Sequence, residues 1–139
     1  MAPGRTIPSY ETIRKEMGIK FEQMKTNMKA EFATIDDFSI TADCWTGAKR
    51  GYLGVTIHWI KPDLTRDSAF LACQRITGTH SYDVLAKHLY QILVEYEIQN
   101  KCRGCVTDGG SNFVKCFKQF GEIINFSEND EEFLSKQRY

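Results

Sequence analysis

Apolar and polar residues alternate one by one from Phe38 to Trp45, in the stretch FSITADCW. This period of two predicts a β-strand with two different faces. One residue does not suit that strand, because Asp43 places a carboxylate where Asp is usually depleted. A carboxylate buried in a sheet would need a partner, hydrogen bonds or a metal ion. The stretch therefore predicts both a strand and a chemically special position within it.

A spacing of three to four residues between apolar positions predicts a long helix ahead of this strand. The helix runs from about Tyr10 to Phe32, and Ser9 is well suited to be its N-cap. Its apolar residues fall on one stripe, which we expect to pack on a sheet as part of the core. The stripe consists of Ile13, Met17, Phe21, Met24 and Met28.

Two further helices are predicted later in the chain. One extends from Tyr82 to Ile98 with Ser81 as its N-cap, and the other is capped by Ser111 and reaches about Phe120. Their apolar residues recur at helical spacing, so both helices are expected to pack on a sheet. The inward residues expected in the last helix are Phe113, Val114 and Phe117.

Three more strands complete the prediction. Tyr52–Ile60 and Ser68–Ile76 are rich in apolar and β-branched residues, and short turns join them to the first strand. Strands joined in this way form an antiparallel meander. The fourth strand, Cys102–Thr107, follows a helix, as a strand that is added in parallel does. We therefore predict an α/β fold with a three-stranded antiparallel meander plus a parallel fourth strand, packed by helices.

This pattern divides the chain into three parts. Residues 1–9 are predicted to be a flexible N-terminus, residues 10–125 the folded domain, and residues 126–139 a polar tail with an acidic cluster. The fourth strand is expected at an exposed edge of the sheet. Because an exposed edge can pair with another chain, we expect self-association or a partner protein.

Composition narrows the class of protein. With 139 residues, 42% of them hydrophobic, the chain is long enough for one domain with a core. Its 18 basic and 18 acidic residues balance, so net charge neither predicts nor excludes nucleic-acid binding. No apolar run approaches the ~20 residues of a membrane span, and no signal peptide is recognisable, so no membrane association is expected.

The five cysteines indicate reduced thiols, because their number is odd and no secretory signal accompanies them. Cys102 and Cys105 form a CxxC pair, but no second pair of ligands lies near it, so no zinc site is expected. We interpret the thiols as buried structural residues.

A second acidic residue, Asp108, ends the fourth predicted strand and is followed by GGSN. If that strand lies beside the first, Asp43 and Asp108 approach each other at one sheet edge. Paired carboxylates of this kind hold the metal ions of phosphoryl-transfer sites, and Mg²⁺ prefers such hard oxygen ligands. Two other interpretations stay open. The aspartates are cap or turn residues, or GGSN before a helix is a nucleotide-binding turn, although it lacks the lysine of a P-loop.

Three segments together resemble the N-terminal half of the hAT transposase catalytic domain, found in hobo- and Activator-type elements and in domesticated relatives with BED zinc fingers. The segments are SITADCWTGAKRGYLGVTIHWI, GTHSYDVLAKHLYQIL and VTDGGSNFVKCF, and the resemblance spans Pro8 to Phe120. Its most specific feature is a strand ending in D-x-W-[ST], here Asp43–Thr46, followed by a TD-x-x-SN turn, here Thr107–Asn112.

The resemblance implies a partial RNase H-like fold, DNA as a partner and a nuclear, or otherwise cytoplasmic, location. It also implies that Asp43 and Asp108 are the first two acids of a DDE triad that binds Mg²⁺ or Mn²⁺. Trp45 matches a tryptophan for which packing is the expected role. His80 and Asn112 are, with Trp45, candidates for a DNA or structural contact.

The sequence departs from the family pattern at two points. Gly109 and Gly110 stand where relatives usually have Asn-Ala, and the family's third acid belongs to a late helix beyond Tyr139. The resemblance therefore implies a catalytically incomplete domain, domesticated or truncated, that acts as a DNA-associated or protein-interaction module. Alone it would bind Mg²⁺ weakly and is not expected to be an enzyme. The alternative is part of an active DDE transposase or nuclease whose third acid lies outside this chain.

Overall fold

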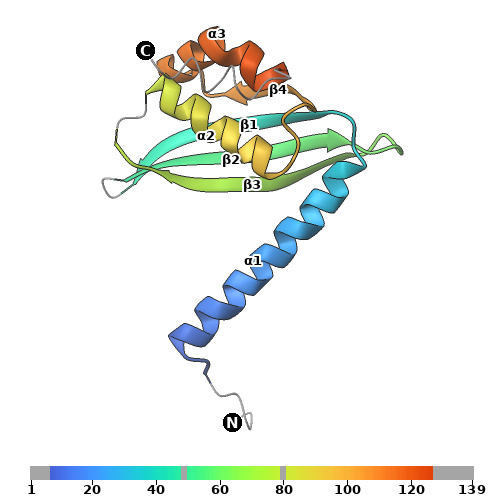
Figure 1. Ribbon diagram of the computed structural model, residues 1–139, viewed down its shortest axis with the longest axis vertical. Helices are drawn as coiled ribbons and strands as arrows, with labels where there is room; N and C mark the ends of the chain where they lie inside the picture. Colours follow the sequence, from blue (N-terminus) through green and yellow to red (C-terminus); the bar gives the residue numbers. More distant parts are fainter. Residues whose placement is uncertain (1–6, 48–49, 79–80, 127–139) are drawn as a thin grey trace.

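The computed structural model describes residues 7–47, 50–78 and 81–126, and for residues 120–126 only the backbone. The elements follow the predicted order of helix, three strands, helix, strand and helix (Figure 1). They are α1 (Tyr10–Ala33), β1 (Phe38–Gly47), β2 (Arg50–Ile60), β3 (Arg66–Ile76), α2 (Tyr82–Glu95), β4 (Cys102–Thr107) and α3 (Ser111–Phe126).

The described strands form one sheet in the order β3-β2-β1-β4. The pairs β1–β2 and β2–β3 are antiparallel, whereas β4 runs parallel to β1. The parallel return is made through α2, because two parallel neighbours need a long connection. Within the described residues β4 pairs with β1 alone and so forms an edge of the sheet. The predicted fold class is therefore confirmed, and it is consistent with a partial RNase H-like fold.

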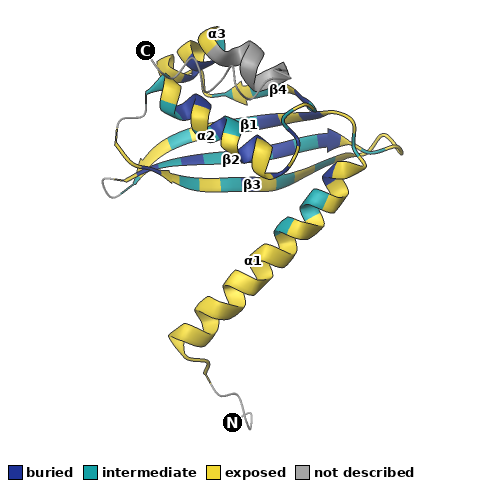
Figure 2. Cartoon of the chain, in the orientation of Figure 1, coloured by how far each residue is buried: buried dark blue, intermediate teal, exposed yellow. Residues whose placement is uncertain are grey.

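The two faces of this sheet are covered differently (Figure 2). On the covered face, every second residue of β1 and β2 is buried against α2 and α3 in one core. Core residues of these elements include Ile40, Ala42, Leu53, Val55, Ile57, Leu85, Leu89, Ile92, Phe113 and Cys116. On the opposite face, called the open face, no helix of the described residues lies over the strands. The open face includes Thr41, Asp43, Trp45, Gly54, Thr56 and His58.

The helix α2 ends at Glu95 rather than at Ile98, where the apolar spacing placed its end. Glu97 adopts a positive φ of 61°, which stops the helix. The N–H of Ile98 donates to the carbonyl of Leu93 at 3.0 Å, and the N–H of Glu97 donates to that of Val94 at 2.9 Å. These two bonds form a Schellman-type end. They turn the chain so that Ile98 enters the core as a residue outside the helix.

The expectation that the apolar stripe of α1 packs on the sheet is wrong for most of its length. Ile13, Met17, Phe21 and Met24 are 43%, 66%, 51% and 47% exposed. The helix begins after Ser9, whose hydroxyl accepts from the N–H of Thr12 as an N-cap should. It then projects away from the sheet, and therefore nothing in the described chain covers the stripe (Figures 1 and 2).

Only the C-terminal end of α1 joins the core. Phe32 is buried, and its ring makes edge-on contacts with the rings of Phe38, Trp59 and Tyr96. Met28, one turn earlier, is partly buried against the same cluster. Ion pairs tie the neighbouring turns to the end of α2. They join Lys25 to Glu95 and Lys29 to Glu97.

The last helix differs from its prediction in three details. Ser111 is the first helical residue and not a cap ahead of the helix, and α3 continues beyond Phe120 to Phe126. Phe113 is buried and Phe117 is half-buried, but Val114 is 43% exposed. Val114 follows Phe113 directly in the chain. Residues on one face of a helix are three or four positions apart, so the face that buries Phe113 leaves Val114 more exposed.

The cysteines follow their prediction in part. Cys102 and Cys116 are buried, whereas Cys44 and Cys105 are half-buried. Cys73 is exposed, so its interpretation as a buried thiol is wrong. No helix among the described residues is long and apolar enough to cross a membrane. His80 and the acidic tail after residue 126 lie outside the described residues.

Candidate metal site beside the end of β4

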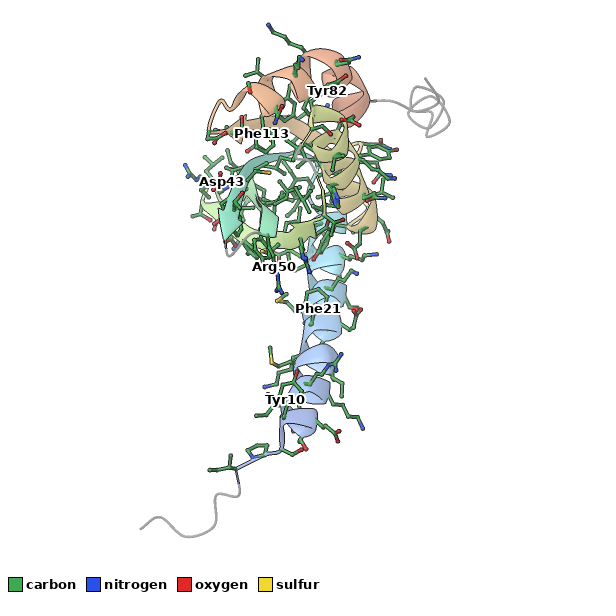
Figure 3. All side chains as sticks on the ribbon, turned by 90° about the vertical axis from the view of Figure 1, so that its left-hand side faces the viewer. Tyr10, Phe21, Asp43, Arg50, Tyr82 and Phe113 are labelled. Carbon is green, nitrogen blue, oxygen red and sulfur yellow. The ribbon has the colours of Figure 1, made fainter. Side chains whose placement is uncertain are left out.

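Asp43 lies on the open face because its neighbours on β1 alternate. Ala42 is 3% exposed and faces the core, so the next side chain points to the opposite side. Figure 3 shows Asp43 on the side of the sheet away from α2. Asp43 is exposed, and the idea of a buried carboxylate that requires a partner is therefore wrong. Among the described residues its side chain has no hydrogen-bond or ion-pair partner, which leaves both carboxylate oxygens available as ligands.

Strand register places Asp108 next to Asp43. Ala42 of β1 pairs with Thr107, the last residue of β4, and each of these residues is followed by an aspartate. Side chains at matched positions of parallel neighbours point to the same face, and such strands lie about 4.8 Å apart. The parallel pairing thus brings the two predicted site residues to the same end of the sheet, each directly after the last pair of the β1–β4 register.

The thiol of Cys44 lies near both carboxylates. The pKa of this thiol is raised to about 11, first by burial and then by the negative charges of Asp43 and Asp108. The sign follows from electrostatics, because a thiolate is disfavoured close to other negative charges. The charges of both aspartates therefore reach the same thiol.

The turn after β4 fixes the Asp108 side chain. Its Oδ1 accepts a hydrogen bond from the N–H of Gly110 at 3.0 Å, and the Thr107 hydroxyl accepts from the N–H of Gly109 at 3.4 Å. Gly109 has a φ of +76°, a conformation that favours glycine. The prediction of a turn aspartate is thus correct for Asp108, yet the turn engages only one of its two oxygens.

The same bonds argue against a nucleotide-binding turn. A phosphate held before a helix is bound by free backbone N–H groups. Here the N–H groups of Gly109 and Gly110 already donate to side chains of their own turn. The N–H groups of Gly109 and Gly110 are therefore not free to bind a phosphate.

Trp45 forms one wall beside Asp43. Its ring stacks on that of Tyr52, with the centroids 5.7 Å apart and the planes 22° apart. It also lies over Gly54, the residue paired with Asp43 across β1 and β2. A Cβ atom on Gly54 would be only 2.8 Å from the Trp45 ring. The absence of a side chain at Gly54 therefore allows Trp45 to lie flat beside the carboxylate.

A polar row on the open face was missed from the sequence. The hydroxyls of Thr41 and Thr56 share a hydrogen bond of 2.5 Å, and the Thr56 hydroxyl bonds to Nε2 of His58 at 2.9 Å. The signal was present in the predicted hairpin, because Thr41 alternates with Ala42 and lies opposite Thr56 once the register is known. Beside this row a hollow of about 780 Å³ opens toward the start of β1, and neither Asp43 nor Asp108 lines it.

The described residues supply two acids to the site. Within residues 7–47, 50–78 and 81–126 no group of three or more His, Cys, Asp or Glu side chains is placed to hold a metal ion. Asn112 is exposed in the first turn of α3. The donor set is therefore a pair of carboxylates, which suits Mg²⁺ or Mn²⁺ in ligand type but supplies few of the six ligands that Mg²⁺ prefers.

Comparison with known proteins gives a match to one protein family and to several relatives. Residues 41–132, which include both aspartates, match the ZBED1 RNase-like domain. The chain is 23% identical to the putative transcriptional regulator tpeD of Talaromyces stipitatus, over 88% of this chain and 14% of the relative. It is 26% identical to the putative AC transposase and the putative AC9 transposase of Zea mays, over 80% of this chain and 14% of each relative. The chain thus spans about one seventh of the length of these relatives.

Proposed function

This chain belongs to the ZBED1 RNase-like domain family and is a transposase-derived domain of the hAT type, and we propose that it presents Asp43 and Asp108 to a divalent cation. The observation that carries the proposal is the register of β1 and β4, in which the pair Ala42–Thr107 directly precedes the two aspartates. Two carboxylates on one sheet face produce a local negative field that attracts a cation.

Each side chain has a defined part in this proposal. Asp43 offers two free oxygens, and Asp108 offers the oxygen that its turn leaves unbonded. The Trp45 ring lies over Gly54, the residue paired with Asp43. When bound, Mg²⁺ or Mn²⁺ supplies positive charge that stabilises the oxygens of a reacting phosphodiester. With two protein carboxylates the ion keeps most of its water, so binding is weak, with a dissociation constant on the order of 1 mM.

We propose further that the described domain is catalytically incomplete and serves a DNA-associated role in the nucleus. Support comes from the two-acid donor set and from the relatives, one of which is a putative transcriptional regulator while two are putative transposases. The second candidate function is a share in an active transposase or nuclease. It is favoured by the register of β1 and β4, in which Asp43 and Asp108 each follow a residue of the last pair.

Titration of the protein with Mn²⁺, followed by paramagnetic broadening of its NMR signals, tests the cation site. Saturable broadening should centre on Asp43, Cys44 and Asp108, and excess Mg²⁺ should reverse it. Asp43→Asn should weaken binding by about tenfold or more, because it removes a full negative charge from the donor set.

The matched control is Asp63→Asn in the loop between β2 and β3. Asp63 accepts from the N–H of Thr65 at 2.9 Å, as Asp108 accepts from its own turn, but it lies away from the pair. Broadening that persists unchanged in Asp43→Asn would disprove the cation site. Nicking of supercoiled DNA separates the two candidate functions: the incomplete domain should show none, whereas Mn²⁺-dependent nicking that Asp43→Ala abolishes would establish the active alternative.

A further inference from the structure

The projecting part of α1 carries a continuous apolar stripe that the rest of the described chain leaves uncovered. Because a helix turns once every 3.6 residues, Ile13, Met17, Phe21 and Met24 lie on one side of it. Each is between 43% and 66% exposed. Figure 3 shows Tyr10 and Phe21 on the length of α1 that lies clear of the sheet. An exposed stripe of this size indicates an interaction surface.

The charges on α1 indicate which partner fits the stripe. Between residues 11 and 25, each acidic residue has a basic residue that lies the same number of positions from Gly18 in the opposite direction along the chain. These mirrored pairs are Glu11 with Lys25, Arg14 with Glu22, and Glu16 with Lys20. Lys15 lies on the side of the helix away from the stripe and has no counterpart. If two copies of the helix are aligned antiparallel at Gly18, each of these acidic residues is therefore at the level of a basic residue of the other copy.

An antiparallel pair with a two-fold axis converts this pattern into contacts. Such a pair places residues that are equally distant from the axis opposite each other, and each flank of one helix faces the same flank of the other. At about 100° per residue, Glu16 and Lys20 lie on one flank of the stripe, Arg14 and Lys25 lie on the other, and Glu11 and Glu22 lie farther round toward the back of the helix. With the axis at Gly18, Glu16 of each helix faces Lys20 of the other. We propose that α1 pairs antiparallel with α1 of a second copy of this chain, about an axis at Gly18.

The surroundings of Gly18 suit this geometry. No atom lies within 4 Å of the place where its Cβ would be, so Gly18 adds no side chain that could obstruct a partner helix beside the stripe.

The domain itself limits the overlap of the two helices. Lys25 already pairs with Glu95, and Met28 is partly buried against the core. The free part of α1 therefore ends near Lys25, which is where the mirrored charges end. An overlap from Glu11 to Lys25 is about 21 Å long, and it would hold the two sheets at opposite ends of the helix pair.

The charges also admit a simpler explanation, because Glu16 and Lys20 are four apart and can pair within one helix. A mixing experiment separates the two explanations. Glu16→Lys alone and Lys20→Glu alone each place two like-charge pairs in the antiparallel dimer. When the two variants are mixed, each helix meets the opposite charge on its partner, although neither regains the pair within its own helix.

Sedimentation equilibrium of the 139-residue chain provides the measurement. The unchanged chain should dimerise, each single variant should dimerise about tenfold more weakly, and the equimolar mixture should recover the affinity of the unchanged chain. Met17→Glu should give a monomer. The matched control Ile19→Glu, at a 50% exposed residue on the opposite side of the helix, should still dimerise.

Three results would overturn the proposal. They are a monomer for the unchanged chain up to about 100 μM, a dimer that Met17→Glu leaves intact, and a mixture that is no tighter than its two components. The second result would indicate pairing through another surface, such as the β4 edge. Because these variants lie on α1, they also leave the cation site untouched, and both proposals can be judged separately.

Discussion

The covered and open faces of one sheet differ in what their side chains do, although the same strands supply both. On the covered face, alternate residues of β1 and β2 such as Ile40, Val55 and Ile57 are at most 1% exposed and join the core. On the open face, the residues between them carry a carboxylate, hydroxyls and an imidazole. The alternation along each strand thus places the residues that stabilise the fold on one face and the polar residues on the other. Neighbouring positions should therefore respond differently to substitution.

The largest difference is expected between two isoleucines of β2. Ile57 is fully buried, whereas Ile60 is 65% exposed on the same strand. Ile57→Ala should lower the free energy of unfolding by about 2–5 kcal/mol because it leaves a cavity in the core. Ile60→Ala should lower it by less than about 1 kcal/mol. Urea unfolding of the two variants checks this, and equal losses would show that the open face is packed as tightly as the covered one.

A smaller effect is expected at Gly54, a glycine of β2 that lies beneath the Trp45 ring. Gly54→Ala forces its Cβ against the Trp45 ring and should lower the free energy of unfolding by about 1–3 kcal/mol. Trp45 fluorescence should shift as the ring moves away from Asp43. Gly104→Ala is the matched control, because nothing lies within 4 Å of its Cβ position. If both variants behave alike, Trp45 does not depend on Gly54.

The smallest effect is expected in the pKa of the Cys44 thiol, which depends on the charges of Asp43 and Asp108. The pKa of Cys44 is about 11, so at pH 8 only a small fraction is thiolate, and alkylation should speed up as pH rises. Asp43→Asn removes one of the negative charges that raise this pKa. The thiolate fraction at pH 8, and with it the alkylation rate, should therefore rise roughly twofold.

Residue-resolved mass spectrometry measures this rate, and the exposed Cys73 is the internal control because it should react alike in both proteins. A slower reaction of Cys44 in Asp43→Asn would contradict the assigned sign of the charge effect. An unchanged rate would place Asp43 too far from the thiol to act on it.

Much of the open-face site could be predicted because it depends on local pattern. Alternation around Asp43 defined a strand, and the helix before Cys102–Thr107 indicated a parallel neighbour. Together they placed Asp108 beside Asp43. The pair Thr41–Thr56 was missed because it requires the exact register of the hairpin, which the pattern alone does not fix.

The errors arose where the sequence lacks the relevant signal. The apolar spacing of α1 is correct, but spacing does not tell which surface will cover it, and most of the stripe of α1 stays exposed. The end of α2 depends on Glu97 at a positive φ, a conformation that usually signals glycine. Asp43 was interpreted as a special position because strands disfavour aspartate and a buried carboxylate would need a partner, whereas an uncovered face admits it without one.

Sharing of one ion between Asp43 and Asp108 is the central claim, and a double-mutant cycle on Mn²⁺ affinity tests it most directly. Asp43→Asn, Asp108→Asn and the double variant are compared with the unchanged protein in the NMR titration. If one ion bridges both carboxylates, each single variant loses most of the binding, and the double variant loses little more than either one. Independent losses that multiply in the double variant, or no loss from Asp108→Asn, would contradict the shared site.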